Sequence, residues 1–167
     1  NGKAGERFCI RNSGVDVVVE GIGDHGLEYM TGGHVLILGD VGKNFGQGMS
    51  GGVSYIFPSD VNEFKEKHAL STLEFSDVTY EEEKQFIKSM LEAHVKYTHS
   101  SKAQILLQRF DQISESVVKV IPKDYKLMMQ KIDIQLRHHN QKDEAMLAAF
   151  YDERTSIDTK LKPAVVY

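Results

Sequence analysis

The sequence contains a literal G-x-G-x-x-G motif, Gly21-Ile-Gly23-Asp-His-Gly26, the kind of loop that binds the pyrophosphate of a dinucleotide. An acidic residue, Asp40, lies 19 positions after the first glycine, where such folds bind the ribose. The mechanism also needs a helix whose N-terminus points at the phosphates. Only residues 27–31 separate the motif from the next glycine pair, and a βαβ crossover needs at least about ten residues. We therefore expect a structural corner here and no nucleotide site.

Two further positions could in principle supply a nucleophile or a proton relay. Cys9 is the single cysteine of the chain, which excludes an internal disulfide and a cysteine-based zinc site. It lies between Phe8 and Ile10, so we expect an ordinary buried or half-buried thiol. The pair Asp24-His25 could relay protons, but no serine or cysteine can be placed beside it from the sequence. We expect a turn at this pair.

The remaining polar candidates have simpler structural explanations. His94 and His99 are five residues apart and share no helix face, so we expect no metal site. His138-His139 sits at an expected helix end, where positive charge complements the helix dipole. We interpret Glu81–Glu83 as a solvated first helical turn and Met128-Met129 as core or interface filling. The sequence thus predicts no catalytic, cofactor-binding or metal-binding residue in this chain.

The elements that carry these residues differ along the chain, as the glycines show. All 14 glycines of the 167 residues fall between Gly2 and Gly52, and none follows. Dense glycine indicates unusual backbone angles or close backbone approach, whereas a glycine-free stretch rich in Glu, Lys, Gln and Leu favours helices. The chain therefore holds two kinds of structure.

The glycine-rich part repeats every 19 residues. Gly14, Gly33 and Gly52 are in register, and Met30-Thr-Gly-Gly33 recurs almost literally at residues 49–52. This period is a suitable circumference for one rung of a parallel β-solenoid. We predict a right-handed parallel β-helix over residues 1–57, with one polar column hydrogen-bonded along the stack and three successive apolar columns lining the inside. The polar column is Asn12, Thr31 and Ser50, and the apolar columns are Val17/Leu36/Tyr55, Val18/Ile37/Ile56 and Val19/Leu38/Phe57.

The second part is predicted to be helical. We expect a connector with some extended structure over residues 58–78 and a helix over about 80–97 that begins with the capping box Thr79–Glu82. Ser100 or Ser101 should cap a second helix, antiparallel to the first, and Val117–Ile121 should be extended. Helices over about 123–138 and 142–153 and a tail over 154–167 complete the chain. In this scheme the helical segment 79–153 should cover the end of the β-helix.

Charge and hydropathy exclude several classes of protein. The net charge is -4 and the pI is near 6.0, which does not fit a nucleic-acid binder or a polybasic membrane patch. The longest apolar runs are far too short to span a bilayer, and no signal segment opens the chain. We expect a soluble, cytoplasmic protein without nucleic-acid or membrane partners.

Four runs of residues carry a resemblance to a known family. They are Gly5–Gly14, Val19–Gly33, Gly42–Gly52 and Val118–Tyr125, and together they resemble the C-terminal GXGXG domain of the glutamate synthase large chain. The resemblance covers roughly residues 1–126. It implies a parent enzyme that releases ammonia from glutamine in an amidotransferase domain and uses it to convert 2-oxoglutarate to glutamate in a flavin domain.

The resemblance also implies cofactors and partners of that parent enzyme. The family uses FMN and an iron–sulfur cluster, and its electrons come from a pyridine-nucleotide-dependent reductase subunit or from ferredoxin. One cysteine cannot hold a cluster that needs several thiolates, so these groups are expected outside this chain. In the family the β-helix is a scaffold that packs against the amidotransferase and FMN domains.

We weigh three hypotheses for the function. The first is a noncatalytic scaffold fragment of a glutamate synthase large chain. Asn1-Gly2-Lys3 does not look like a chain start, so we expect upstream rungs to complete the stack in that protein. The second is an independent β-helix assembly module similar to the C subunit of formylmethanofuran dehydrogenase. The third, a small nucleotide-dependent oxidoreductase, rests on residues 21–26 alone.

Overall fold

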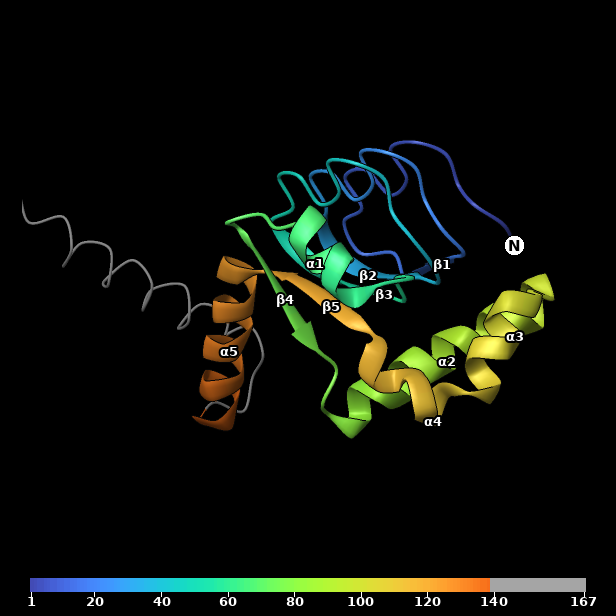
Figure 1. Cartoon of the computed structure of the whole chain (residues 1–167). Coiled ribbons are helices and arrows are strands. Elements are labelled where there is room, and N and C mark those ends of the chain that lie inside the picture. Colours follow the sequence, from blue (N-terminus) through green and yellow to red (C-terminus); the bar gives the residue numbers. More distant parts are fainter. Residues whose placement is uncertain (139–167) are drawn as a thin grey trace, which may run out of the picture. The chain divides into compact units, whose positions relative to one another are not determined.

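The computed structural model describes residues 1–138, which contain five strands and five α-helices (Figure 1). Residues 1–123 form one compact unit, and the second unit begins at Asp124. The predicted helix 142–153 and tail 154–167 lie outside the described residues. The elements are β1 (Val17–Val19), β2 (Thr31–Ile37), β3 (Gly51–Ile56), α1 (Val61–Lys67), β4 (Leu73–Asp77), α2 (Glu81–Thr98), α3 (Ser101–Gln108), α4 (Phe110–Ile113), β5 (Val118–Pro122) and α5 (Lys123–His138).

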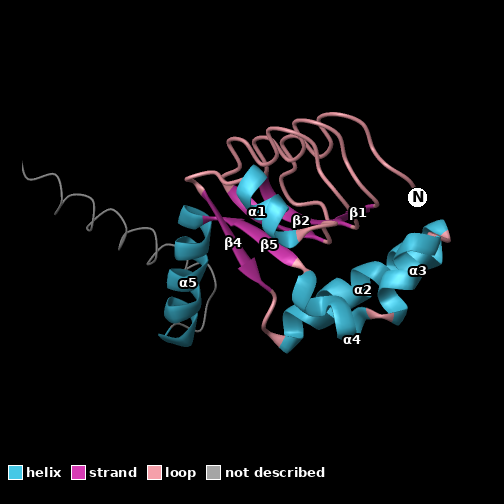
Figure 2. Ribbon diagram, viewed as in Figure 1, coloured by secondary structure: helices cyan, strands magenta, loops and turns pink. Residues whose placement is uncertain are grey.

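The glycine-rich part winds into three stacked coils, each of which contributes one parallel strand (Figures 1 and 2). Between β2 and β3 the paired residues are 19 apart, as in Leu36↔Tyr55, which matches the sequence period. Between β1 and β2 they are 18 apart, because Val18 pairs with Leu36. The predicted column that joins Val17 to Leu36 is therefore wrong by one residue. A slip of one residue moves a side chain to the opposite face of the sheet.

The strands bury both of their faces. Val35, Ile37 and Ile56 point into the coils, where they pack with Leu27, Met30 and Phe45. Helices α2, α3 and α4 form a helical layer on the other face of the sheet. The alternate residues Leu36, Leu38, Tyr55 and Phe57 pack with residues of this layer, such as Ile87 and Leu91. The prediction that three successive apolar columns all line the inside is thus wrong, because successive side chains of a strand point to opposite faces. An apolar run without alternation is typical of such a doubly covered strand.

Most hydrogen bonds between the coils join backbone groups. The amide of Thr31 donates to the carbonyl of Asn12 (2.8 Å), and the amide of Ser50 donates to that of Met30 (2.9 Å). The Asn12 side chain bonds within its own coil, to Val15 N (3.0 Å) and Val15 O (2.8 Å). The prediction that the Asn12 side chain hydrogen-bonds along the stack is therefore wrong. The Asn12 carboxamide forms a local turn, a common use of this side chain.

Each coil also contains a segment in which every second residue has a positive φ. Ordinary residues avoid this left-handed region, which costs them about 1–2 kcal/mol. The conformation turns alternate amides toward the following coil: Arg7 N donates to Asp24 O (2.8 Å), and His25 N to Lys43 O (2.8 Å). The hydrogen bonds between coils therefore offset the backbone strain. The positions are 7, 9 and 11, then 25, 27 and 29, then 44, 46 and 48, and only the third coil has glycine at any of them.

The sheet changes direction after the third coil. β5 pairs antiparallel with β3, and β4 pairs antiparallel with β5, so the strand order is β1-β2-β3-β5-β4 (Figure 2). Helix α1 packs on the same end of the coils, where Phe64 meets Phe45 edge to face at a centroid distance of 6.1 Å. The segment expected to be a connector thus holds α1 and β4. The end of the coils is covered by α1, while α2 and α3 pack on the outer face of the sheet.

The bounds of the longer helices follow the prediction closely. Helix α2 spans 81–98 against the predicted 80–97, and α5 spans 123–138 as predicted. Ser100 caps α3 by accepting a hydrogen bond from Ala103 N (3.0 Å). The predicted capping box at Thr79–Glu82 is wrong, because α2 begins after Tyr80 without a side-chain cap. None of the described helices is long and apolar enough to cross a lipid bilayer.

Candidate functional site

The G-x-G-x-x-G motif forms the corner between β1 and β2. Residues 24–29 are turns, and β2 begins at Thr31 without an intervening helix, so the motif opens no helix of its own. Asp24 Oδ1 accepts a hydrogen bond from Lys43 N (2.7 Å) in the next coil. The sequence predicted a structural corner at this motif, and the turn found there also links two coils.

Asp40 has an equivalent role at the next corner. Its two carboxylate oxygens accept hydrogen bonds from Ser59 N (2.9 Å) and Ser59 Oγ (2.8 Å). The hydrogen bond from the Ser59 amide is the main cause that lowers the pKa of Asp40. Because Asp40 and Ser59 are 19 residues apart, the interaction continues the period of the stack.

Neither Cys9 nor His25 has the surroundings of a reactive group. Burial raises the pKa of the Cys9 thiol, so the thiol stays protonated at neutral pH. His25 Nδ1 lies 2.7 Å from Glu28 Oε1, so the partner of this ring is Glu28 in its own turn and not the neighbouring Asp24. The surroundings of Cys9 and His25 therefore fit the structural roles expected from the sequence, a packed thiol and a turn.

A serine, a histidine and a glutamate meet where α2 ends against the first coil. The Ser100 hydroxyl donates to Glu20, and this bond is the main cause that lowers the pKa of Glu20. His94 is 8% exposed, and its Nε2 has no hydrogen-bond partner among the described residues. A hydrolytic triad needs the serine bonded to the histidine, and here it is bonded to the carboxylate. His99 is the left-handed C-cap of α2.

One half-buried polar cluster was not predicted from the sequence. Glu83 Oε1 accepts from the Tyr55 hydroxyl (2.7 Å) and from Lys119 Nζ (2.5 Å), which joins β3, α2 and β5. The Glu83 side chain is 15% exposed, so the interpretation of 81–83 as a solvated turn is wrong for this residue. Burial, with Glu83 beside it, raises the pKa of Tyr55. The signal was present, because Glu83 lies four residues before buried Ile87 on the same helix face.

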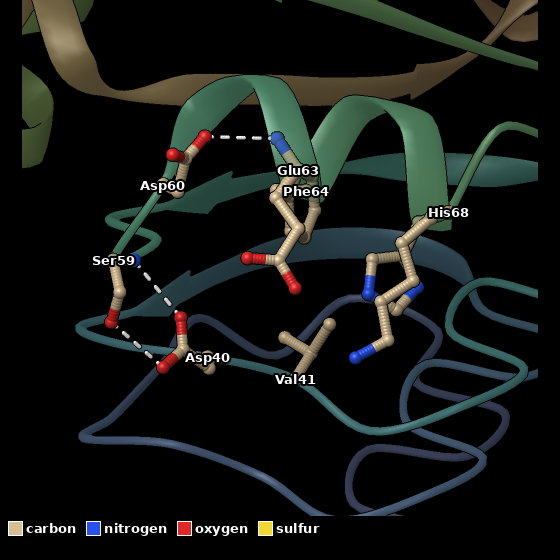
Figure 3. A pocket seen from close by; sticks show the side chains of 8 residues that line it. Asp40, Val41, Ser59, Asp60, Glu63, Phe64 and His68 are labelled. Carbon is tan, nitrogen blue, oxygen red and sulfur yellow. Dashed lines mark hydrogen bonds between the residues drawn. The ribbon is translucent and has the colours of Figure 1, made fainter.

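Two pockets lie where α1 covers the third coil. The larger, of about 190 Å³, contains three carboxylates, and His68 lies on the side away from Asp40 (Figure 3). The smaller, of about 100 Å³, has no acidic residue and shares Lys67 and His68. Burial lowers the pKa of His68, so its imidazole is neutral at pH 7. The larger pocket is lined by Asp40, Val41, Ser59, Asp60, Glu63, Phe64, Lys67 and His68, and the smaller by Asn44, Phe45, Gln47, Lys67, His68, Ala69 and Leu70.

The other candidates from the sequence do not converge on a site. Within residues 1–138, no three His, Cys, Asp or Glu side chains come together in a way that could hold a metal ion. Met129 on α5 is 45% exposed. His138 ends α5, and His139 lies outside the described residues.

Comparisons with known proteins relate the chain to one group. The family of the GXGXG motif matches residues 1–123. The chain is 54% identical over 90% of its length to the glutamate synthase [NADPH] large chain of Bacillus subtilis, and 43% identical over 78% of its length to the glutamate synthase [NADH] of Schizosaccharomyces pombe. It is 43% identical over 72% of its length to the ferredoxin-dependent glutamate synthase 2 of Arabidopsis thaliana.

The chain spans only a small part of these relatives: 10% of the Bacillus protein, 6% of the Schizosaccharomyces protein and 7% of the Arabidopsis protein. Their names favour the glutamate synthase hypothesis over the independent assembly module. With the family match over residues 1–123 and the parallel coils that carry the motif glycines, the chain belongs to the GXGXG family and resembles the GXGXG domain of glutamate synthases.

Proposed function

We propose that this chain is a noncatalytic scaffold within a glutamate synthase large chain. The observation that carries the proposal is the 54% identity over 90% of this chain to a protein of which it covers only 10%. In the parent enzyme, glutamine, 2-oxoglutarate and a reductant would yield two molecules of glutamate. The scaffold would pack against the amidotransferase and FMN domains, and a reductase subunit or ferredoxin would supply the electrons.

The proposal includes the fold. We infer that residues 1–57 are the last rungs of a right-handed parallel β-helix at the C-terminal side of the large chain. Three parallel coils with the predicted period of about 19 residues support this inference. The free edge of β1 supports it as well, because upstream rungs could continue the stack there.

The residues of this chain do not fit the cofactors of the parent enzyme. Cys9 is its single cysteine, is half-buried and has a raised pKa, so a thiolate-held cluster has no place here. The glycine motif lacks the helix that a nucleotide phosphate needs. FMN and the iron–sulfur cluster are therefore assigned to other parts of the parent enzyme. A cytoplasmic location stays a prediction from the sequence.

Two measurements test the proposal. The 167-residue chain, incubated with glutamine, 2-oxoglutarate, NADPH and FMN, should form no glutamate and should show no saturable binding of FMN or NAD. Turnover, or micromolar affinity for either nucleotide, would contradict a noncatalytic role. In the full-length large chain, deletion of residues 1–123 should abolish glutamate formation through loss of domain assembly, and full activity after the deletion would overturn the scaffold role.

A further inference from the structure

The third coil leaves two backbone amides without the acceptors that their counterparts have. At the first left-handed position, Arg7 N donates to Asp24 O and His25 N donates to Lys43 O, both at 2.8 Å. The equivalent residue of the third coil is Asn44, with φ of 56°. No acceptor for the Asn44 amide occurs among the described residues, because α1 follows where a fourth coil would lie.

The same loss recurs four residues later. Arg11 N donates to Glu28 O (2.9 Å) and Tyr29 N donates to Gln47 O (3.0 Å), whereas the Gly48 amide has no such partner in the described part of the chain. The amides of both earlier coils point along the stack toward the next coil. The amides of Asn44 and Gly48 therefore point out of the end of the stack. Alternating right- and left-handed residues with free amides form concavities that bind anions.

The smaller pocket opens at Asn44. His68 lines it, is 7% exposed, and makes no side-chain hydrogen bond in the described residues. A neutral imidazole has one N–H donor, and here that donor is free to bind a ligand in the pocket. The pocket thus gathers unpaired donors from two separate elements, the third coil and the end of α1.

Charge distinguishes this pocket from its larger neighbour. Lys67 adds a positive charge at the rim, Gln47 adds a carboxamide, and no acidic residue lines the cavity. The larger pocket instead contains Asp40, Asp60 and Glu63, which would repel an anion. The volume of about 100 Å³ suits a group as small as a carboxylate.

We propose that the pocket between the third coil and the end of α1 binds the carboxylate group of a small organic acid. The Asn44 amide and the Lys67 ammonium bind the carboxylate oxygens, and His68 donates its ring N–H. The site is independent of the scaffold role, since it uses the end of the stack and not its packing against other domains.

The test is a titration of the ¹⁵N-labelled 167-residue chain with sodium acetate at constant ionic strength, followed by amide chemical shifts. We expect saturable shifts at Asn44 with a dissociation constant in the millimolar range, which is usual for a ligand of so few atoms. Lys67→Gln should weaken acetate binding by about fivefold or more, which corresponds to about 1 kcal/mol. The matched control Lys96→Gln, on the exposed side of α2, should leave the affinity unchanged.

Acetamide separates charge from shape, because it has nearly the same size and a carbonyl oxygen but no charge. It should bind at least fivefold more weakly than acetate. Equal affinity for the two probes, or acetate shifts that do not saturate at Asn44, would overturn the carboxylate site. An unchanged affinity in Lys67→Gln, with the spectrum of a folded protein, would overturn it as well. None of these outcomes bears on glutamate synthesis, so the site and the proposed function are tested separately.

Discussion

Close backbone packing distinguishes the coils of this protein from its helical layer, where side chains make the contacts. In the coils, neighbouring turns of backbone approach so closely that a β-carbon at Gly51 would lie 2.2 Å from the carbonyl oxygen of Thr31. In the helical layer, side chains make the contacts, through apolar packing and the cluster of Tyr55, Glu83 and Lys119. The difference teaches that the coils, although apolar side chains fill their interior, also depend on the absence of a β-carbon at positions such as Gly51, whereas the helical layer depends on its side chains.

The largest effect is expected from adding a single methyl group in the coils. Gly51→Ala should cost more than about 4 kcal/mol of the free energy of unfolding, because the Thr31 backbone cannot move without breaking the ladder. The matched control is Gly5→Ala, where a β-carbon meets no atom within 4 Å. Urea unfolding followed by circular dichroism measures both. Equal stability of the two variants would contradict the view that backbone proximity governs the coils.

The helical layer should be most sensitive at a charged side chain. Glu83→Ala leaves Tyr55 and Lys119 without their partner and should cost about 3 kcal/mol. Glu83→Gln keeps an acceptor for the Tyr55 hydroxyl and should cost less. Glu82→Ala, at the exposed neighbouring position, should change stability by less than about 0.5 kcal/mol. Similar losses at residues 82 and 83 in the same unfolding assay would show that the cluster contributes nothing specific.

Acid should act on the buried histidines before it acts on the carboxylates of the coil corners. Burial lowers the pKa of His94 and His68 in the folded protein, so the unfolded chain binds protons more readily below its usual histidine pKa of about 6.5. The free energy of unfolding should therefore fall as the pH drops below about 6.5, by up to about 1.4 kcal/mol per pH unit for each histidine. His94→Gln should flatten this slope.

The carboxylates of the coil corners titrate in a lower window. The pKa of Asp40 is lowered, so its stabilising contribution is present above its unfolded value of about 4 and is lost only as the pH falls further. Asp40→Asn should therefore leave the slope between pH 6.5 and 5 unchanged. A flat stability profile in that range for the unmodified chain would refute the histidine assignment.

The smallest expected effect comes from substitution to asparagine, which should change the free energy of unfolding in opposite directions in the two regions. Arg11 is an exposed coil residue with φ of 56°, a conformation that asparagine tolerates better than arginine. Arg11→Asn should raise the free energy of unfolding by about 0.5 kcal/mol through relief of that strain. Glu92→Asn, at an exposed position inside α2, should lower it by about 0.5 kcal/mol because asparagine is a poorer helix former. Thermal unfolding measures both, and two changes of the same sign would remove the distinction.

Local and periodic features could be predicted from the sequence. The spacing of Gly33 and Gly52 predicted the pairing of β2 with β3, and Ser100 predicted the start of α3. Helix α1 was missed although Asp60 and Glu63 carry its signal, since Asp60 accepts from Glu63 N (2.9 Å) at the start of the helix. A seven-residue helix gives too short an apolar pattern to recognise.

Features that depend on contacts distant in sequence could not be predicted. Val117–Ile121 was expected to be extended, and β5 spans Val118–Pro122, but nothing local shows that this strand pairs antiparallel with β3. The shift of β1 by one residue depends on how its turn closes against β2. The pocket at Asn44 arises only because the stack ends there, and the sequence around it has the same period as the coils before it.

The pairing of β3 with β5 sets a time interval in the synthesis of this protein. β3 ends at Ile56, and its partner begins at Val118, so about 60 residues must be translated before the edge is covered. At about 5–20 residues per second, the ribosome needs about 3–12 s for this segment. During that interval a nascent chain exposes an apolar strand edge, the template on which neighbouring chains aggregate. Codon choice between β3 and β5 would therefore affect the yield of soluble protein without changing a single residue.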